Sequence, residues 1–251
     1  MDEISLDRLI GRGAQADVYL HDGQAIKHFH KEVSQESVLS EADIQQKIFK
    51  TGLPAPRVYG VATISGRPAI AMEYFKGPTL GNLMMEDPAR IMEYLTRTVE
   101  MQVQTHKTSG EGLPSQKEKL SVRIAAVTAL KDECKQKLLV LLNTLAHDSA
   151  VCHGDFHPYN LIQAEQGYKI IDWADASCGT PAADACRSYL LYLLHGKEAA
   201  EGYLQLYCAL SGIPREDILK WLPVQAGARL LEAGRGDDVS LLLRLAESSA
   251  Q

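Results

Sequence analysis

The chain has 251 residues, of which 45% are hydrophobic and 23% are charged, and its formal net charge is −6. This composition is ordinary for a soluble globular protein with one large domain or two lobes. The acidic balance argues against nucleic acid or anionic lipid as the main partner. The five cysteines form no CxxC pair, the first residues lack a signal-peptide pattern, and no apolar run reaches the roughly 18 residues that span a bilayer. We therefore expect a cytoplasmic protein without a membrane partner.

The first 75 residues have the pattern of a small sheet with one helix. Five short segments alternate apolar and polar residues, and the Asp-Gly pair in "HDGQ" is a hairpin signal. Val38, Ile44 and Ile48 recur near helical spacing, with a serine cap before them and Gly52 as a stop. The predicted strands cover residues 4–10, 16–20, 24–29, 58–64 and 68–75, and the predicted helix covers 34–52.

The segment "KGPTLG" (76–81) separates this region from a helical remainder. Apolar spacing predicts helical regions over 88–106, over 116–146 and from Pro181 to the end, interrupted by a polar octet and short strands. The pattern predicts an α+β protein with a cleft between two lobes. The expected front lobe covers 1–75, the linker 76–81 and the helix-rich back lobe 82–251.

Residues 153–160, "HGDFHPYN", concentrate polar side chains beside an apolar segment. Three interpretations compete. His153, Asp155 and His157 are spaced like the ligands of a metal cage, but the other histidines supply no second ligand motif. The glycine and the proline of the octet would permit an ordinary surface turn. The third interpretation is the catalytic loop of a phosphoryl-transfer enzyme.

The segment "KIIDW" (169–173) favours the third interpretation. Its Asp172 ends an apolar strand, twelve positions after Asn160. Carboxylate and carboxamide oxygens suit Mg²⁺, which takes its other ligands from water and nucleotide phosphates. Asp155 then remains to orient a hydroxyl nucleophile and to accept its proton, as phosphoryl transfer requires.

A glycine-containing hairpin follows the first predicted strand. "GRGAQADVYL" contains Gly11, Gly13 and Val18, in a pattern that suits a loop folded over phosphates. The signal is weak by itself because Ala16 stands where a third glycine is expected.

Lys27 shares a predicted strand face with Ala25 and Phe29. Its ammonium group either extends to solvent or pairs with phosphate oxygens and a carboxylate of the following helix. Glu41 is the first choice for that carboxylate and Glu36 the reserve. The order of hairpin, lysine, helix, linker, polar loop and aspartate is the order of a protein-kinase-like fold.

These motifs resemble the aminoglycoside phosphotransferase family, which includes choline kinase and related enzymes. "HGDFHPYNLI" is similar to the family's catalytic loop, "IIDW" to its metal-binding strand, and "AMEYFKGPTL" to its interlobe hinge. "SCGTPAADACRSYLL" resembles the segment after the metal site. The resemblance covers roughly residues 4 to 195 and implies a two-lobe protein-kinase-like fold, with a nucleotide-binding front lobe and a catalytic, acceptor-binding back lobe.

The resemblance also implies roles for single residues in catalysis. Asp155 would be the catalytic base, and Asn160 and Asp172 would bind Mg²⁺. Lys27 would contact the α and β phosphates, with Glu41 as its partner.

Other residues would surround the nucleotide by the same resemblance. Glu73 and Phe75 would meet the adenine edge through backbone groups, with Met72 behind them. Val18 and Ala25 would cover the base, and the hairpin glycines would lie over the phosphates.

Two further residues are expected to support the catalytic loop. Asp184 would be a buried support, and His157 would order the loop.

Departures from protein kinases favour a small acceptor. His153-Gly154 replaces the arginine that precedes the base, no Ala-Pro-Glu segment follows, and the stretch after Asp172 is too short for an activation loop. We therefore predict an ATP- and Mg²⁺-dependent phosphotransferase, with GTP as an alternative donor. It would move the γ-phosphoryl group to a hydroxyl of an aminoglycoside, an amino alcohol or a sugar-like molecule.

Alternative functions remain open at this level. They are a nucleotide-binding pseudokinase or scaffold, a protein kinase and, last, a metal hydrolase. Glu232, Arg235 and Asp175 suit either an acceptor pocket or a solvated helix face. The sequence leaves the acceptor and the oligomeric state open.

Overall fold

A computed structural model describes residues 7–234 and 237–248. The chain forms two compact units, one of Met1–Leu83 with Tyr159–Ala174 and one of Met84–Pro158 with Asp175–Gln251. The sequence placed the boundary at 76–81 and everything after it in the back lobe. The structure groups residues 159–174 with the first unit instead.

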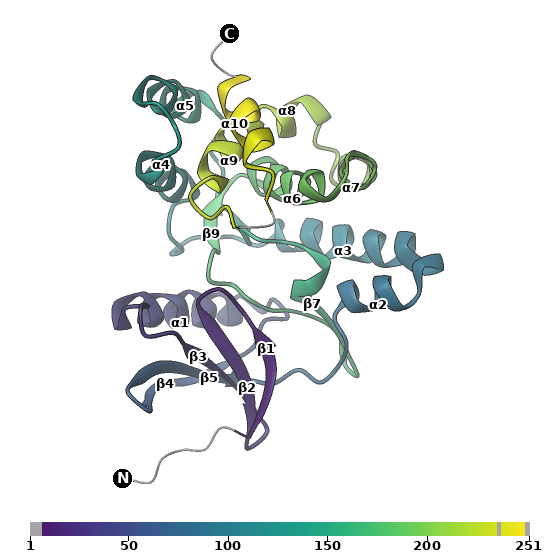
Figure 1. Ribbon diagram of the computed structural model, residues 1–251. Helices are drawn as coiled ribbons and strands as arrows, with labels where there is room; N and C mark the ends of the chain where they lie inside the picture. The colour runs from purple at the N-terminus through teal and green to yellow at the C-terminus, as the bar shows by residue number, and fades with distance from the viewer. Residues whose placement is uncertain (1–6, 235–236, 249–251) are drawn as a thin grey trace. The chain divides into compact units, whose positions relative to one another are not determined.

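The first unit contains a five-stranded antiparallel sheet in the order β1-β2-β3-β5-β4 (Figure 1). Asp22 and Gly23 both have positive φ, as do Ser65 and Gly66, which is the backbone of tight hairpin turns. All five predicted strands are confirmed within the described residues; the predicted start of the first strand at residues 4–6 lies outside them. The strands are β1 Arg8–Arg12, β2 Ala16–His21, β3 Gln24–Phe29, β4 Val58–Ile64 and β5 Arg67–Glu73.

Helix α1 (Gln35–Lys50) packs on this sheet, as predicted. Ser34 caps its N-terminus by accepting a hydrogen bond from the amide of Ser37, and Gly52 follows its end with a φ of 85°. Val38 lies in a buried cluster with Phe29 of β3 and other apolar residues of the sheet. This packing places the middle of α1 beside the central strands.

A second hairpin joins the first unit although it comes much later in the chain. Strands β7 (Leu161–Ala164) and β8 (Gly167–Ile170) pair antiparallel. The amide of Gln163 donates to the carbonyl of Pro78, and the amide of Ile170 donates to the carbonyl of Pro54. A Cβ at Gly77 would overlap the carbonyl oxygen of Gln163, so glycine permits this close approach.

Helix α2 (Leu80–Glu86) begins inside the segment predicted as a linker. The hydroxyl of Thr79 accepts a hydrogen bond from the amide of Asn82 at 3.1 Å. The amides of the first helical turn have no acceptor within the helix. The hydroxyl of Thr79 supplies one of them with an acceptor, which explains why the helix starts there.

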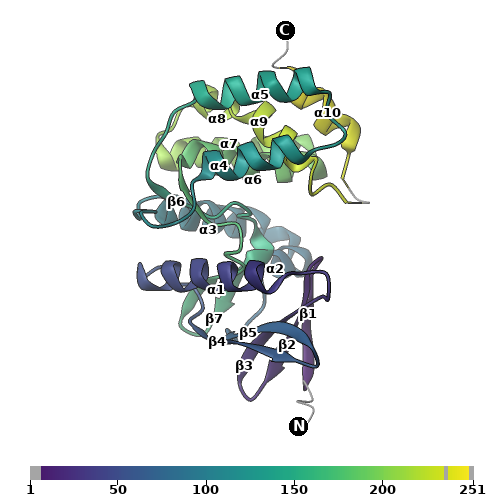
Figure 2. The same cartoon turned by 90° about the vertical axis from the view of Figure 1, so that its left-hand side faces the viewer.

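The second unit is mainly helical, and Figure 2 shows α4 and α5 running along one flank of it. One helical region was predicted over 116–146. The structure has two helices there, α4 (Gln116–Ala126) and α5 (Asp132–Thr144), and the residues between them are not helical. Val127 and Leu130 are buried in this connection, and Val127 and Lys131 have extended backbone. The elements are 3₁₀ helix Pro88–Arg90, α3 Ile91–Thr105, α4 Gln116–Ala126, α5 Asp132–Thr144, β6 Ala150–Cys152, β9 Ser177–Gly179, α6 Pro181–His195, α7 Lys197–Ser211, α8 Arg215–Leu219, α9 Leu222–Arg229 and α10 Val239–Glu247.

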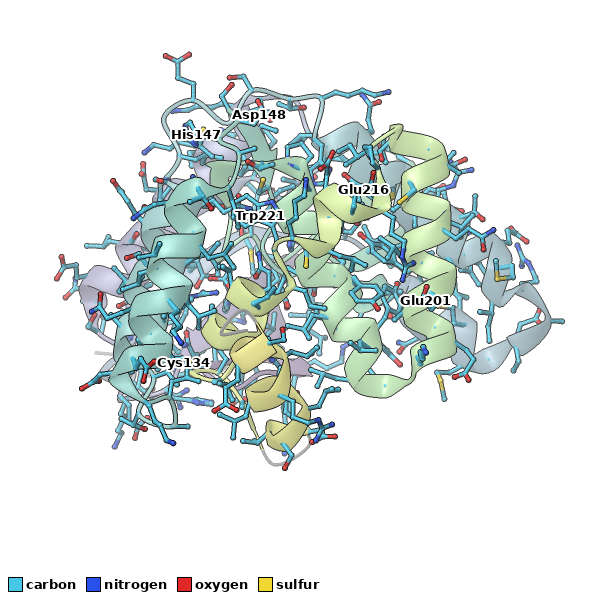
Figure 3. The ribbon with its side chains drawn as sticks, turned by 90° about the horizontal axis from the view of Figure 1, so that it is seen from above. Cys134, His147, Asp148, Glu201, Glu216 and Trp221 are labelled. Carbon is cyan, nitrogen blue, oxygen red and sulfur yellow. The ribbon has the colours of Figure 1, made fainter. Side chains whose placement is uncertain are left out.

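The core of the second unit is apolar and aromatic. Trp221, Tyr203 and Tyr207 are at most 2% exposed, and Figure 3 shows Trp221 among the helices of this unit. The hydroxyl of Tyr203 donates to the side-chain oxygen of Gln102 on α3 at 2.6 Å. Across the described ranges, no helix has both the length and the apolar composition that crossing a membrane requires.

Candidate active site

Asn160 and Asp172 lie at the same end of the β7–β8 hairpin. Leu161 pairs with Ile170 in the ladder, and the amide of Ile171 donates to the carbonyl of Asn160 at 2.9 Å. Asp172 follows directly with a φ of 62°, a conformation that non-glycine residues adopt rarely and Asp and Asn more readily than most. The hairpin register thus brings together two residues that are twelve positions apart.

Lys27 on β3 joins this group from the sheet. Its Nζ lies 2.6 Å from Oε1 of Glu41 and 3.0 Å from Oδ1 of Asp172. The partner is therefore the first-choice glutamate, and the reserve, Glu36, is exposed. Burial lowers the pKa of Lys27, but the charges of Asp172 and Glu41 outweigh it, so the pKa lies above its ordinary value.

The donor chemistry at this end of the hairpin fits Mg²⁺. Asn160 offers a carboxamide and Asp172 a carboxylate whose side chain is 49% exposed. Mg²⁺ in phosphate-binding proteins is held by one or two such oxygens and completes its shell with water and phosphate. Asn160 and Asp172 therefore form an adequate protein ligand set for a metal-nucleotide complex.

Three predicted nucleotide contacts share the sheet face of Lys27. Val18 pairs with Lys27, and Ala25 is two residues from it and pairs with Met72. Paired residues and residues two apart lie on the same face of a sheet. The structure therefore brings Val18, Ala25 and Met72 to the face that carries the lysine.

The other predicted nucleotide residues lie at the hairpin and at the end of β5. Gly11 pairs with Val18, and the amide of Gly13 donates to the carbonyl of Ala16 to close the β1–β2 turn. Glu73 ends β5, and its amide donates to the carbonyl of Arg57. Phe75 is buried, with the Nζ of Lys169 5.2 Å from its ring centroid.

The polar loop with Asp155 belongs to the second unit and is fixed to α6. Asp184, which is 1% exposed, accepts hydrogen bonds from the amide of Gly154 at 2.7 Å and from Nε2 of His106 at 2.9 Å. The hydroxyl of Ser188 donates to the carbonyl of Phe156 at 2.8 Å. This geometry agrees with the structural role expected for Asp184.

The Asp155 carboxylate contacts two nitrogen groups. Its Oδ2 lies 3.2 Å from Nε2 of His157 and its Oδ1 lies 3.6 Å from Nη2 of Arg187. Burial raises the pKa of Asp155, but the hydrogen bond and charge of His157 and the charge of Arg187 outweigh it, so the pKa lies well below its ordinary value. Asp155 is consequently ionised at neutral pH, as a proton acceptor must be.

The metal-cage interpretation of the octet does not hold. His153 is fully buried and packs edge-on against Phe156, and its Nδ1 accepts the amide of Asp155. Within the part of the chain that the structure describes, the cluster with metal-ligand spacing is Asp7, His21 and Asp22 instead.

The sequence analysis did not predict an ion-pair network that lies next to Asp155. Arg187 lies three residues after Asp184 on α6 and is almost fully buried, and its Nη2 lies 2.7 Å from Oε2 of Glu232. The spacing of three, which places two helical residues on one face, was the available signal. Glu232 is therefore no solvated helix residue, and Arg235, named beside it, lies outside the described residues.

A family model described as the phosphotransferase enzyme family (APH) matches residues 8–221. The chain belongs to this phosphotransferase family. Family and enzyme class agree with the prediction from the motifs, so the chain is a small-molecule kinase by class. A comparison with curated protein sequences found no significant match.

Solved structures agree with the fold expected for a phosphotransferase of this family. A thermostable mutant of aminoglycoside phosphotransferase APH(4)-Ia is 14% identical, with 98% of this chain and 94% of that chain covered and a TM-score of 0.69. Choline kinase LicA from Streptococcus pneumoniae is 18% identical, with 98% and 93% covered and a TM-score of 0.64. At these identities the likeness concerns the fold alone, and it confirms the α+β kinase-like fold class.

Gly154 of the phosphotransferase has a φ of 84°, and a Cβ there would lie 2.7 Å from the carbonyl oxygen of Asp175. We expect Gly154→Ala to destabilise the protein more than Gly112→Ala. Gly112 has the same φ of 84°, but no atom of the described residues lies within 4 Å of the position that its Cβ would take. Both substitutions cost about 1–2 kcal/mol of backbone strain, and the steric overlap at Gly154 adds about 1–3 kcal/mol.

Urea unfolding of the two variants and of the parent protein measures this difference directly. Equal losses in the free energy of unfolding would show that the loop tolerates a side chain at Gly154 and that its contact with Asp175 is not tight.

Proposed function

We propose that this phosphotransferase moves the γ-phosphoryl group of ATP to a hydroxyl of a small molecule, with Mg²⁺ as cofactor. GTP is the alternative donor. The observation that supports the proposal most strongly is the contact of Lys27 with both Glu41 and Asp172, at the hairpin end that carries Asn160. A lysine, a carboxylate and a carboxamide suit a metal triphosphate.

The first unit supplies the nucleotide-binding residues in this proposal. Lys27 binds phosphate oxygens and is held in place by Glu41. Asn160 and Asp172 hold Mg²⁺, which neutralises negative charge on the phosphates when it is bound. Val18 and Ala25 cover the adenine, and Met72 lies behind the residues that meet its edge.

The end of β5 and the hairpin complete the nucleotide contacts. Glu73 and Phe75 meet the adenine edge through backbone groups, and Gly11 and Gly13 lie over the phosphates.

The second unit supplies the catalytic base in this proposal. Asp155 accepts the proton of the acceptor hydroxyl while the acceptor oxygen forms a bond to the γ phosphorus. The bond between that phosphorus and the β–γ bridging oxygen breaks, and ADP leaves with the electron pair. His157 and Arg187 hold the carboxylate of Asp155 in its ionised form. Asp155 precedes Asn160, the proposed metal ligand, by five residues in the chain.

A screen of acceptors tests the proposal. Purified protein with Mg²⁺ and ATP is incubated with neutral sugars, amino sugars, amino alcohols and hydroxylated acids, and ADP release is followed by a coupled assay. We expect at least one class to raise ADP release well above the rate without acceptor. The same slow rate with every class and with GTP as donor would count against an alcohol as the acceptor.

A further inference from the structure

A pocket in the second unit lies beside the catalytic loop and carries mostly positive charge. It is lined by Lys119 and Arg123 of α4, Arg187 of α6 and Gly154, together with the carboxylates of Asp175 and Asp184 and with uncharged side chains. The pocket belongs entirely to the second unit. It therefore lies within one compact body that also carries Asp155.

The carboxylates of the pocket are already engaged by its cations. Asp175 lies 3.4 Å from Nζ of Lys119 and 2.5 Å from Nη2 of Arg123. Asp184 also lines the pocket, but it is fully buried and accepts from Gly154 and a histidine. An amine that entered the pocket would have to compete for these carboxylates with the protein groups that already contact them.

Glu232 bridges Arg123 and Arg187, the two arginines that line the pocket. Its oxygens lie 2.7 Å from Nη1 of Arg123 and 2.7 Å from Nη2 of Arg187. Arg229 also contacts Glu232, at 3.1 Å, but has a carboxylate of its own in Asp237 at 3.0 Å. Asp155, which is ionised and lies 3.6 Å from Nη2 of Arg187, is the third carboxylate beside the cations Lys119, Arg123 and Arg187.

Two of the cations that line the pocket are only partly satisfied by their surroundings. Nε of Arg187 is buried and has no hydrogen-bond partner among the residues that the structure describes, which is costly for a guanidinium group. Burial lowers the pKa of Lys119, and the charge of Arg123 lowers it further; Asp175 does not reverse this shift. Both groups would be stabilised by an incoming anion.

We propose that this pocket binds an acidic group of the acceptor, a carboxylate or a phosphate, and so selects hydroxylated acids over amines. The inference rests on the proposed function, because it names the acceptor class of the same site. Arg187 connects the two parts: it lines the pocket, and its Nη2 lies 3.6 Å from Oδ1 of Asp155. An acid held by Arg187 keeps its own hydroxyl within reach of the base.

The test uses probes that share a ring and differ in charge: glucuronate, glucose and glucosamine, with glycerol 3-phosphate and glycerol as a second set. Binding to the full-length protein is measured by calorimetry, with Mg²⁺ and a non-hydrolysable ATP analogue present to fill the phosphate-binding residues of the first unit. We expect at least one acid to bind about tenfold or more tightly than its neutral and amine counterparts.

Variants assign that binding to the pocket. Arg123→Gln and Lys119→Gln should each weaken binding of the preferred acid by about tenfold, and Arg123→Lys should restore part of it. Arg215→Gln is the matched control, because Arg215 makes an exposed ion pair with Glu201 on α7, outside the pocket (Figure 3). Thermal unfolding and binding of the ATP analogue show whether each variant is folded.

Tighter binding of the neutral or amine probes, no binding of either acid, or an unchanged affinity in Arg123→Gln and Lys119→Gln would each overturn the assignment. The ADP-release screen separates this failure from failure of the proposed function. If amines or neutral sugars stimulate ADP release, the kinase activity stands and the acidic-acceptor assignment falls.

Discussion

Asp155→Asn is expected to lower kcat by about 10²–10⁴, the usual contribution of a positioned general base. The substitution keeps the size of the side chain but removes the oxygen charge that accepts the hydroxyl proton. Affinity for Mg·ATP should stay within about twofold, since the proposed nucleotide ligands are other residues. Steady-state ADP release and calorimetric ATP titration measure the two quantities separately.

Asp148→Asn is the control for this substitution. Asp148 is an exposed carboxylate seven residues earlier in the same unit, where it accepts a hydrogen bond from the amide of Ser149 (Figure 3). It should leave kcat unchanged. A near-normal kcat in Asp155→Asn would remove Asp155 from the mechanism.

The second large effect is expected for Asp172→Ala, in the affinity for nucleotide. Loss of this carboxylate should weaken Mg·ATP binding by at least 10–100-fold, since even changes to partners of a metal ligand typically cost about that much. The affinity for ATP without Mg²⁺ should change little, because Lys27 keeps its contact with Glu41 at 2.6 Å. Titrations with and without Mg²⁺ separate the two contributions.

Two further variants make this experiment specific. Asp172→Asn tests the charge alone, since asparagine tolerates the φ of 62° better than alanine. Glu165→Ala removes an exposed carboxylate from the turn of the same hairpin and should have no effect. If Mg²⁺ strengthened ATP binding equally in Asp172→Ala and in the parent protein, Asp172 would not be a metal ligand.

The parts of the fold that local chemistry determines could be predicted from the sequence. The Asp22-Gly23 turn and the serine cap of α1 are set by residues next to each other, so the sheet and its helix followed from them. The preference for Glu41 over Glu36 agrees with the structure, because Glu41 lies on the buried side of α1, where the sheet carries Lys27.

Features that depend on distant packing could not be predicted. The β7–β8 hairpin joins the first unit through hydrogen bonds to Pro54 and Pro78, which are about a hundred positions away and show no local signal. The break between α4 and α5 arises because Val127 and Leu130 are buried, a property that helical periodicity does not reveal.

The charged residues around Asp155 could be predicted from the sequence only in part, for the same reason. Arg187 and Glu232 are 45 positions apart, and in the sequence each looks like an ordinary charged surface residue. Only the fold shows that they pair, that the arginine is buried, and that it contacts the carboxylate of Asp155.

The most direct test of the central claim is ³¹P NMR of the reaction mixture with Mg·ATP and the best acceptor from the screen. We predict a new phosphomonoester resonance that grows with ADP in equal amounts in the parent protein and is nearly absent with Asp155→Asn. Orthophosphate as the only new product, or a monoester formed equally fast by Asp155→Asn, would contradict the account.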